Sequence, residues 1–489
     1  MATTTEQIQD YGHFIGGAAE APGETFDDMD PFSGDVVARV SAGDREDARR
    51  AVEAAAAAFP AWSQTSPETR QAIFLKAADI LESRGDEVVD LLARETGSTL
   101  GFAMFQLHFV AGLLRQAAAI PYAPIGQVLP TDTPGRLAMG IRQPVGVVGA
   151  IAPWNAAQIL SARSITAPLA LGNTVVLKPS EWSPVVGGLI WGEIFAEAAL
   201  PDGVLNVVTH APGEAAPIAD EFAENPAVRR INFTGSTATG RKLAEAAGRN
   251  LKRIVLELGG YNPLIVLADA DVEYAVNASA FGSFMHQGQI CMSTRRIIVE
   301  RSIADEFSQR LAEKTAGLKT GDPKEPDTVI GPLINAQALK SVRSRVEDAV
   351  AKGAKVLAGG EAVGPAFQAT LLADVPEDSE FAREETFGPV VAIEVVDSAD
   401  EAVRRANATS YGLSAGIITT DPDRGFALAR ELESGIVHVN DQTIADEPQM
   451  PFGGVKGSGY GRFGGQAVID EFTELRWITV QSGSHPYPF

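Results

Sequence analysis

Cys291 is the single cysteine among 489 residues, and its sequence context suggests a reactive role. The preceding Gly288 and Gln289 favour a backbone held close to a small molecule over a helix that fills a core. A thiolate is a strong nucleophile, so a cysteine held in this way could bond covalently to a substrate. The segment alone is equally consistent with a buried, inert cysteine.

Two polar side chains at the ends of apolar runs could assist such a nucleophile. Asn155 follows the run that ends at Ala152, so its amide could donate to a developing oxyanion at a sheet edge, or it could cap the next helix. Glu257 ends another apolar run, and burial would raise its pKa toward the range that a general base needs. A Glu257 turned to solvent is the alternative.

Two further segments could bind a dinucleotide. Lys178-Pro-Ser-Glu181 could hold the hydroxyls of a ribose, with the carboxylate disfavouring a 2′-phosphate, or it could form a surface ion pair. The turn from Gly235 to Gly240 leads from strand into helix, so its amides could face a pyrophosphate, or it could be a plain connection.

Composition excludes several classes of function. The net charge of −23 would repel nucleic acids and anionic membranes. No apolar stretch is long enough to span a membrane, and residues 1–7 carry no secretory signal pattern. With one cysteine, the chain is typical of a reducing interior, so we predict a cytoplasmic protein. None of the six histidines has metal-ligand spacing, and we predict no metal site.

Alternating strands and helices are expected to position these residues. Helices are predicted over 44–63 and 66–95. A first set of β-branched runs, separated by helices, predicts a parallel sheet covered on both faces: 145–152, 174–177, 204–208, 230–233, 254–258 and 264–267. After Gly259-Gly260 a second α/β unit is expected, with strands at 296–299, 390–396, 415–419 and 436–440 and helices near 304–317, 336–352, 399–407 and 423–433.

Two segments remain outside both sets. Residues 123–143 are rich in proline and predict a loop-rich excursion, and residues 475–481 alternate strongly enough to form a strand. A packing extension and an oligomer interface are equally consistent with the pattern.

Taken together and in this order, the motifs resemble those of the NAD(P)-dependent aldehyde dehydrogenase superfamily, from about residue 12 to residue 480. The segments 384–389 and 451–459, each a turn that carries an aromatic ring, complete the set. The amino-acid sequence of 286–294 resembles that of bacterial aromatic-aldehyde dehydrogenases acting on vanillin, benzaldehyde or salicylaldehyde. The resemblance implies an α/β fold with two doubly wound parallel-sheet domains and a β oligomerisation arm, assembled as a homodimer or a dimer of dimers.

The resemblance also implies a division of the chain and of the chemistry. Residues 1–122 and 146–257 would form the NAD-binding domain, 258–460 the catalytic domain, and 123–145 with 461–489 the bridging segments. Cys291 would be the nucleophile, Glu257 the general base, and Asn155 with the Cys291 backbone N–H the oxyanion hole. NAD is the expected cofactor and NADP the less favoured one; its expected contacts are Trp154, Lys178, Ser180, Glu181, Gly235, Ser236, Gly240, Glu385 and Phe387. Tyr261 departs from the usual Lys or Asn, at a position outside the chemistry.

For the substrate we expect an aromatic aldehyde, oxidised to its acid through a cysteine thiohemiacetal and a thioester. Ala156 is small and would widen the tunnel beside Cys291, while Arg163 could donate to a ring hydroxyl or methoxy group, or pair with an acid at a surface. Flat walls are expected from Phe102, Phe105 and Phe452, which could equally be core. His286 is expected on a helix as a packing or tunnel-wall residue, and the Cys291 pKa is expected to be lowered. An aliphatic-aldehyde or semialdehyde dehydrogenase, and a non-catalytic protein that keeps the fold, are the alternatives.

Overall fold

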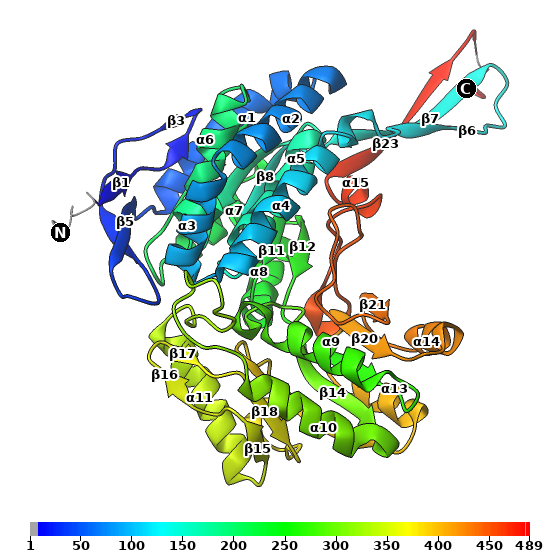
Figure 1. Cartoon of the computed structure of the whole chain (residues 1–489). Coiled ribbons are helices and arrows are strands. Elements are labelled where there is room, and N and C mark those ends of the chain that lie inside the picture. Colours follow the sequence, from blue (N-terminus) through cyan, green and yellow to red (C-terminus); the bar gives the residue numbers. More distant parts are fainter. Residues whose placement is uncertain (1–7, 485) are drawn as a thin grey trace.

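The computed structural model describes residues 8–484 and 486–489, which form two large sheets and a projecting three-stranded arm (Figure 1). The expectation about a secretory signal concerns residues 1–7, which lie outside the described residues. The α/β class with parallel sheets is confirmed.

The first sheet has eight strands in the order β22-β12-β11-β8-β9-β10-β2-β3. The bounds are β2 Phe14–Ile15, β3 Ala18–Ala19, β8 Val147–Ile151, β9 Thr174–Lys178, β10 Leu205–Val207, β11 Val228–Thr234, β12 Arg253–Glu257 and β22 Gly459–Tyr460. From β8 the chain adds β9 and β10 on one side and then β11 and β12 on the other, all parallel. The order reverses at β8, and ligands of such sheets bind beyond the carboxyl ends of the strands at this reversal point.

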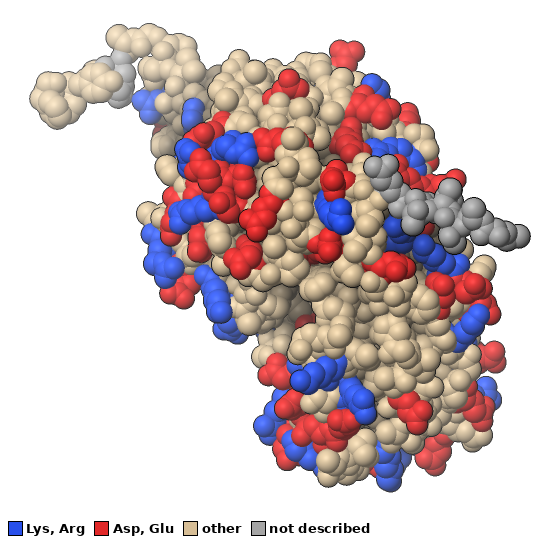
Figure 2. All heavy atoms as spheres, turned by 90° about the vertical axis from the view of Figure 1, so that its left-hand side faces the viewer, with Lys and Arg blue, Asp and Glu red and all other residues tan. Residues whose placement is uncertain are grey.

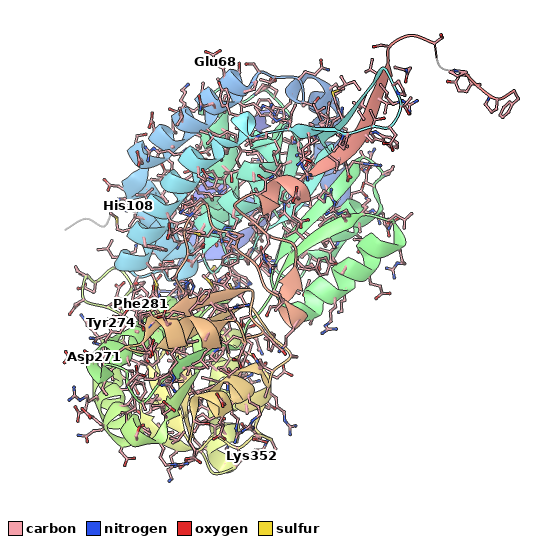
Figure 3. All side chains as sticks on the ribbon, turned by 90° about the vertical axis from the view of Figure 1, so that its right-hand side faces the viewer. Glu68, His108, Asp271, Tyr274, Phe281 and Lys352 are labelled. Atoms are coloured by element: carbon pink, nitrogen blue, oxygen red, sulfur yellow. The ribbon has the colours of Figure 1, made fainter. Side chains whose placement is uncertain are left out.

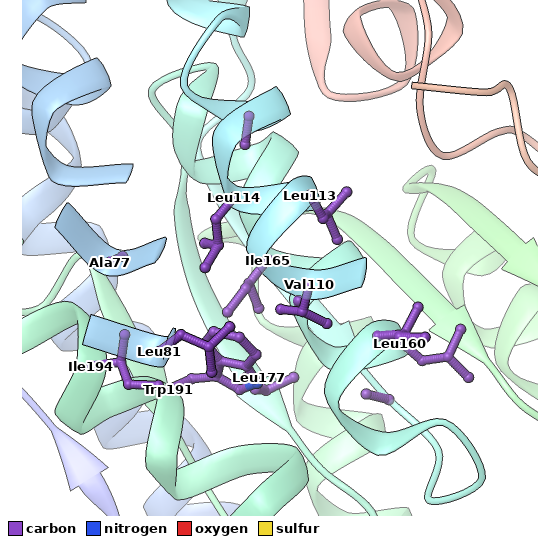
Figure 4. Close-up of a cluster of buried hydrophobic side chains, with 14 of the residues drawn as sticks. Ala77, Leu81, Val110, Leu113, Leu114, Leu160, Ile165, Leu177, Trp191 and Ile194 are labelled. Carbon is purple, nitrogen blue, oxygen red and sulfur yellow. The ribbon is translucent and has the colours of Figure 1, made fainter. Parts of the chain in front are cut away.

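Helices cover both faces of this sheet. Their bounds are α1 Arg45–Trp62, α2 Pro67–Ser83, α3 Gly85–Thr96, α4 Leu100–Ala117, α5 Ala157–Ala170, α6 Ile190–Glu197, α7 Ala216–Glu224 and α8 Thr237–Arg249. One face packs on α1, α7 and α8, and the other on α2, α4, α5 and α6. Figure 4 shows the second of these cores, where Leu81, Leu114 and Ile165 meet Trp191 and Leu177.

The single helix predicted over 66–95 is wrong, because the structure contains two helices there. Arg84 leaves the helical conformation at φ −97° and ψ 19°, and α3 starts at Gly85 with Asp86 and Glu87 in its first turn. Acidic side chains at this position favour a helix N-terminus.

The second sheet has seven strands in the order β15-β18-β19-β14-β13-β20-β21. The strand bounds are β13 Asn262–Val266, β14 Thr294–Glu300, β15 Lys355–Ala358, β18 Thr370–Ala373, β19 Val390–Val396, β20 Ser414–Ile418 and β21 Ile436–Val439. The helix bounds are α9 Val272–Phe284, α10 Arg301–Ala316, α11 Ala336–Ala351, α12 Glu380–Arg383, α13 Ala399–Asn407 and α14 Pro422–Ala429. The strands and helices predicted for this unit are confirmed to within a few residues, although α14 ends earlier than expected. The placement of 264–267 in the first sheet is wrong, because this run forms β13 of the second sheet, between β14 and β20.

The segment 123–143 is not the loop-rich excursion that its prolines predict. It forms β6 (Gly126–Leu129) and most of β7 (Arg136–Pro144), and β7 pairs along its length with β23 (Thr473–Gln481), preceded by α15 (Ala467–Glu471). Figure 1 shows this three-stranded arm projecting from the body. Two smaller sheets are also present. One has three strands in the order β1 (Gln9–Tyr11), β5 (Val36–Ser41) and β4 (Thr25–Met29), and the other pairs β16 (Ala362–Val363) with β17 (Ala366–Phe367).

The surface carries charges of both signs. Figure 2 shows acidic and basic side chains intermixed on one face of the molecule. Among the described residues, no helix is both long and apolar enough to cross a membrane.

Candidate active site

Cys291 lies in an irregular segment between α9 and β14. The helix ends at Phe284, and His286 (φ 50°), Gln287 (φ 55°) and Gly288 (φ 64°) then adopt left-handed conformations in succession. A Cβ at Gly288 would collide with the backbone carbonyl of Gly388, so only glycine fits there. The expected helix at His286 is therefore wrong, and its buried ring instead stacks on Phe102 at 4.5 Å between centroids.

Side chains from elsewhere hold this segment in place. Asn262, at the start of β13, donates to the carbonyl of Cys291 (2.7 Å), and Gln287 donates to carbonyls of two other segments (2.8 and 3.0 Å). The buried Arg295 donates to the carbonyls of Gly288 and Gly388, the latter at 2.8 Å. Because these bonds replace regular secondary structure, they fix the position of the nucleophile.

Asn155 reaches the nucleophile segment from the reversal point of the first sheet. Its buried Nδ2 donates to the carbonyl of Gln289 at 2.9 Å, and α5 has no side-chain cap, so the helix-capping alternative is wrong. A side-chain amide has two N–H donors, and in the described part of the chain the second has no acceptor. Asn155 and Cys291 line the same pocket, so this donor is available to an oxygen bound there.

Glu257 ends β12 and is buried, so the solvent-facing alternative is wrong. Both carboxyl oxygens lack a hydrogen-bond partner among the described residues. Burial raises the pKa of Glu257 well above its usual range, against weaker opposition from the positive charges of Arg462 and Arg163. A Cβ at Gly453 would lie 2.6 Å from Oε1, so the glycine makes room for the carboxyl. The group can hold and release a proton, as a general base must.

The Cys291 thiol is partly buried and strongly disfavours ionisation. Burial raises its pKa to about 12, and the negative charges of Glu385 and Glu257 act in the same direction. The residues around Cys291 therefore raise its pKa, whereas the sequence led us to expect a lowered pKa.

A mostly apolar pocket opens beside Cys291. It is lined by Phe102, Phe105, Phe109, Asn155, Ala156, Ile159, Leu160, Arg163, Ile290, Cys291, Met292, Ile444, Asp446 and Phe452. The structure thus brings together all five tunnel residues expected from the sequence. Phe109 was missed, although its spacing from Phe102 and Phe105 on one helix is a signal that could have identified it.

Arg163 pairs with an acid, as one of the two expectations for it had it, but inside the pocket. Its guanidinium pairs with Asp446 at 2.7 Å, but the pair is 5% and 10% exposed rather than at a surface. The same group lies over the ring of Phe452, 4.4 Å from its centroid. A charged donor and its carboxylate partner therefore stand in a mostly apolar wall. Asp446 was missed because 283 residues separate the partners and no local pattern marks it.

The residues expected to bind a cofactor gather at the carboxyl edge of the first sheet. Lys178 is buried and donates to the carbonyl of Pro179 (3.0 Å). It pairs with no carboxylate among residues 8–484 and 486–489, so the surface ion pair with Glu181 is wrong. Ser180 donates to Glu181 at 3.1 Å. Ser236 caps α8, whose N-terminal turn contains Gly240 and lies directly after β11 and Gly235. A buried ammonium with a spare donor and a helix N-terminus fit a ribose and a pyrophosphate.

Glu385 and Phe387 come from the second unit, where they lie between α12 and β19. Glu385 accepts from the backbone N–H of Gly260 at 3.2 Å, and a Cβ at Gly259 would collide with its carboxylate. Phe387 meets Trp154 edge to face, with centroids 5.7 Å apart. Two of the predicted cofactor contacts, Trp154 after β8 and Phe387 before β19, are therefore in direct contact although they come from different sheets.

Comparison with known proteins agrees with this geometry. The model of the aldehyde dehydrogenase family matches residues 18–478. Vanillin dehydrogenase of Pseudomonas fluorescens is 49% identical over 95% of this chain and 96% of its own, and benzaldehyde dehydrogenase [NAD(+)] of Pseudomonas putida is 42% identical over 100% of both. The crystal structure of a salicylaldehyde dehydrogenase from Pseudomonas putida G7 complexed with salicylaldehyde superposes with a TM-score of 0.96 at 42% identity, over 99% of this chain and 100% of that one.

Proposed function

The chain belongs to the aldehyde dehydrogenase family, and we propose that it oxidises aromatic aldehydes to carboxylic acids with NAD. Members of this family use nicotinamide cofactors. The observation that carries the proposal is the shared pocket, in which Cys291 and Asn155 face aromatic walls and a buried guanidinium.

The first half of the reaction forms a covalent intermediate on Cys291. The thiol first loses its proton to water, and the thiolate attacks the aldehyde carbon while the C=O π-electrons move to oxygen. The oxyanion accepts hydrogen bonds from Asn155 Nδ2 and the Cys291 backbone N–H. A nicotinamide held beside Glu385 and Phe387 would supply the hydride acceptor, and loss of hydride from the thiohemiacetal would leave an acyl thioester on Cys291.

The second half releases the acid. Glu257 takes a proton from water, the hydroxide oxygen attacks the thioester carbon, and the carbon–sulfur bond breaks to return Cys291. Because burial raises the Glu257 pKa, this carboxyl binds a proton more strongly than an exposed one. Glu257 must lose that proton before it can act, so hydrolysis is expected to accelerate as the pH rises through its pKa.

An aromatic substrate fits the walls of the pocket. Phe102, Phe109 and Phe452 offer flat faces, and Ala156 leaves space beside the nucleophile. The Arg163 guanidinium is held by Asp446, so it could donate to a hydroxyl or methoxy oxygen on the ring without being free to leave the pocket. The names of the relatives, which are vanillin, benzaldehyde and salicylaldehyde dehydrogenases, support the same substrate class.

NAD is the proposed cofactor and NADP the less favoured one. The Glu181 carboxylate stands beside the Lys178 turn, where it would repel a 2′-phosphate. The name of the benzaldehyde dehydrogenase relative supports NAD.

The proposed assembly is a homodimer or a dimer of dimers, in which 123–145 and 461–489 bridge subunits. Leu475 and Trp477 on β23 are 63% and 74% exposed, and Tyr274 and Phe281 stand exposed on α9 (Figure 3). Exposed apolar side chains on a projecting sheet favour contact with another copy. The division into an NAD-binding domain (1–122 and 146–257) and a catalytic domain (258–460), and the cytoplasmic location, remain parts of the proposal.

The test is a comparison of NADH formation by the purified protein with vanillin, benzaldehyde and salicylaldehyde against hexanal and succinic semialdehyde. We expect a higher kcat/KM for the aromatic aldehydes. A preference for hexanal or the semialdehyde would overturn the substrate class, and no NADH formation with any of them would favour a non-catalytic role. Repeating the best substrate with NADP tests the cofactor.

A further inference from the structure

His210 lies buried directly against the ammonium of Lys178. The imidazole follows β10 and Lys178 ends β9, so the parallel pairing of these strands places the two side chains together. Lys178 Nζ and His210 Nε2 are 2.5 Å apart, and His210 Nδ1 is 2.9 Å from the carbonyl of Ala211. The sequence gives no motif that marks this histidine.

These two contacts assign the position of the imidazole proton. A carbonyl can only accept, so Nδ1 carries the hydrogen and donates it to Ala211. An ammonium can only donate, so Nε2 must offer its lone pair to Lys178. His210 is therefore neutral, in agreement with burial and the Lys178 charge, which together lower its pKa to about 4. The other charged group that faces it is Glu181, whose carboxylate is 3.9 Å from Nε2.

The arrangement leaves Lys178 with one directed donor. One N–H of the ammonium points to the carbonyl of Pro179 (3.0 Å) and a second to His210. Since the three N–H bonds of an ammonium are tetrahedrally disposed, fixing two of them fixes the direction of the third.

We propose that His210 is a positioning residue for the cofactor: its neutral imidazole accepts a hydrogen bond from Lys178 and thereby directs the remaining ammonium N–H at a ribose hydroxyl. This inference rests on the proposed role of Lys178 in binding the adenosine ribose. His210 does not touch the cofactor in this account, and it affects binding without affecting the chemical steps at Cys291.

The test compares His210→Leu, which removes the acceptor, with His210→Asn, which keeps an acceptor oxygen. For each we would measure the Kd of NADH by its fluorescence, and the KM for NAD and kcat with benzaldehyde. We expect His210→Leu to raise Kd and KM about tenfold, the effect of one lost hydrogen bond to a charged group, with kcat unchanged. His210→Asn should bind NADH nearly as well as the wild type.

The proposal would be overturned if His210→Leu bound NADH as tightly as the wild type. It would also be overturned if His210→Leu and His210→Asn lost the same affinity for NADH. Lys178→Met separates the role of His210 from the proposed function. Unchanged NADH binding by Lys178→Met would refute the ribose site itself. Weakened NADH binding by Lys178→Met together with normal binding by His210→Leu would refute only the role of His210. If His210→Leu does not fold, ¹⁵N-histidine spectra of the wild type, assigned with His210→Asn, decide the matter. A neutral ring protonated at Nδ1 is expected at neutral pH, and protonation at Nε2 would overturn the proposal.

Discussion

The protein without cofactor should react slowly with thiol reagents, although its one cysteine is the proposed nucleophile. The chain raises the pKa of Cys291 to about 12, whereas a free cysteine has a pKa of about 8.5. This difference corresponds to about 5 kcal/mol, or a thiolate population at neutral pH lower by a factor of about 3,000. Because only the thiolate is nucleophilic, the rate of alkylation should fall by the same factor.

The assay is alkylation by iodoacetamide as a function of pH, and Cys291 is the only thiol that can respond. The folded protein is compared with the same chain unfolded in denaturant. We expect the folded-state rate to rise with pH without a plateau until the pH approaches about 12. A plateau near the pKa of a free thiol, about 8.5, would refute the reasoning.

Two variants separate the causes of the raised pKa. Glu385→Gln removes the larger of the two carboxylate effects and should accelerate alkylation, and Glu257→Gln should do so by a smaller factor. Neither should reach the rate of the unfolded chain, because burial is the largest cause and remains. A faster alkylation of Glu257→Gln than of Glu385→Gln would contradict this ranking of the charges around the thiol.

Three further outcomes are expected. Asn155→Ala should lower kcat by about 10²–10³, the effect of one oxyanion donor, and near-normal turnover would remove that role. Glu257→Gln should keep a rapid first burst of NADH while steady turnover collapses; loss of the burst would place Glu257 in the acylation half instead. Asp446→Asn should destabilise the protein by about 3–5 kcal/mol in denaturant unfolding, because it leaves the buried Arg163 charge unpaired. The double variant with Arg163→Met should recover part of that loss, and equal stability of the single and double variants would contradict the pairing.

Local patterns predicted the regular elements well. The strand at 390–396 and the helix at 399–407 have the predicted bounds, because β-branched runs and amphipathic spacing reflect burial directly. The helix break at Arg84 was missed, although the following Gly85 and two acidic residues are a recognisable helix start. The pairing of β7 with β23 joins segments more than 300 residues apart, and neither segment identifies its partner.

Within the site, too, local sequence identifies some residues, whereas others are recognisable only from contacts between distant segments. Cys291, Glu257 and Asn155 stand in motifs that resemblance could identify, and the pocket brings Asn155 and Cys291 together. The left-handed turn before Cys291 was not predictable, because it depends on bonds from Asn262 and Arg295 rather than on local propensity. Asp446 and His210 act through partners that only the tertiary structure supplies.

The most direct test of the account is to trap the acyl enzyme. Glu257→Gln is mixed with benzaldehyde and NAD, quenched in acid and digested, and the peptide that contains Cys291 is weighed by mass spectrometry. We expect a peptide that carries one benzoyl group in place of the thiol hydrogen, and a lower yield of the hexanoyl adduct when hexanal replaces benzaldehyde. An unmodified Cys291 peptide from a reaction that produced NADH would contradict the covalent mechanism.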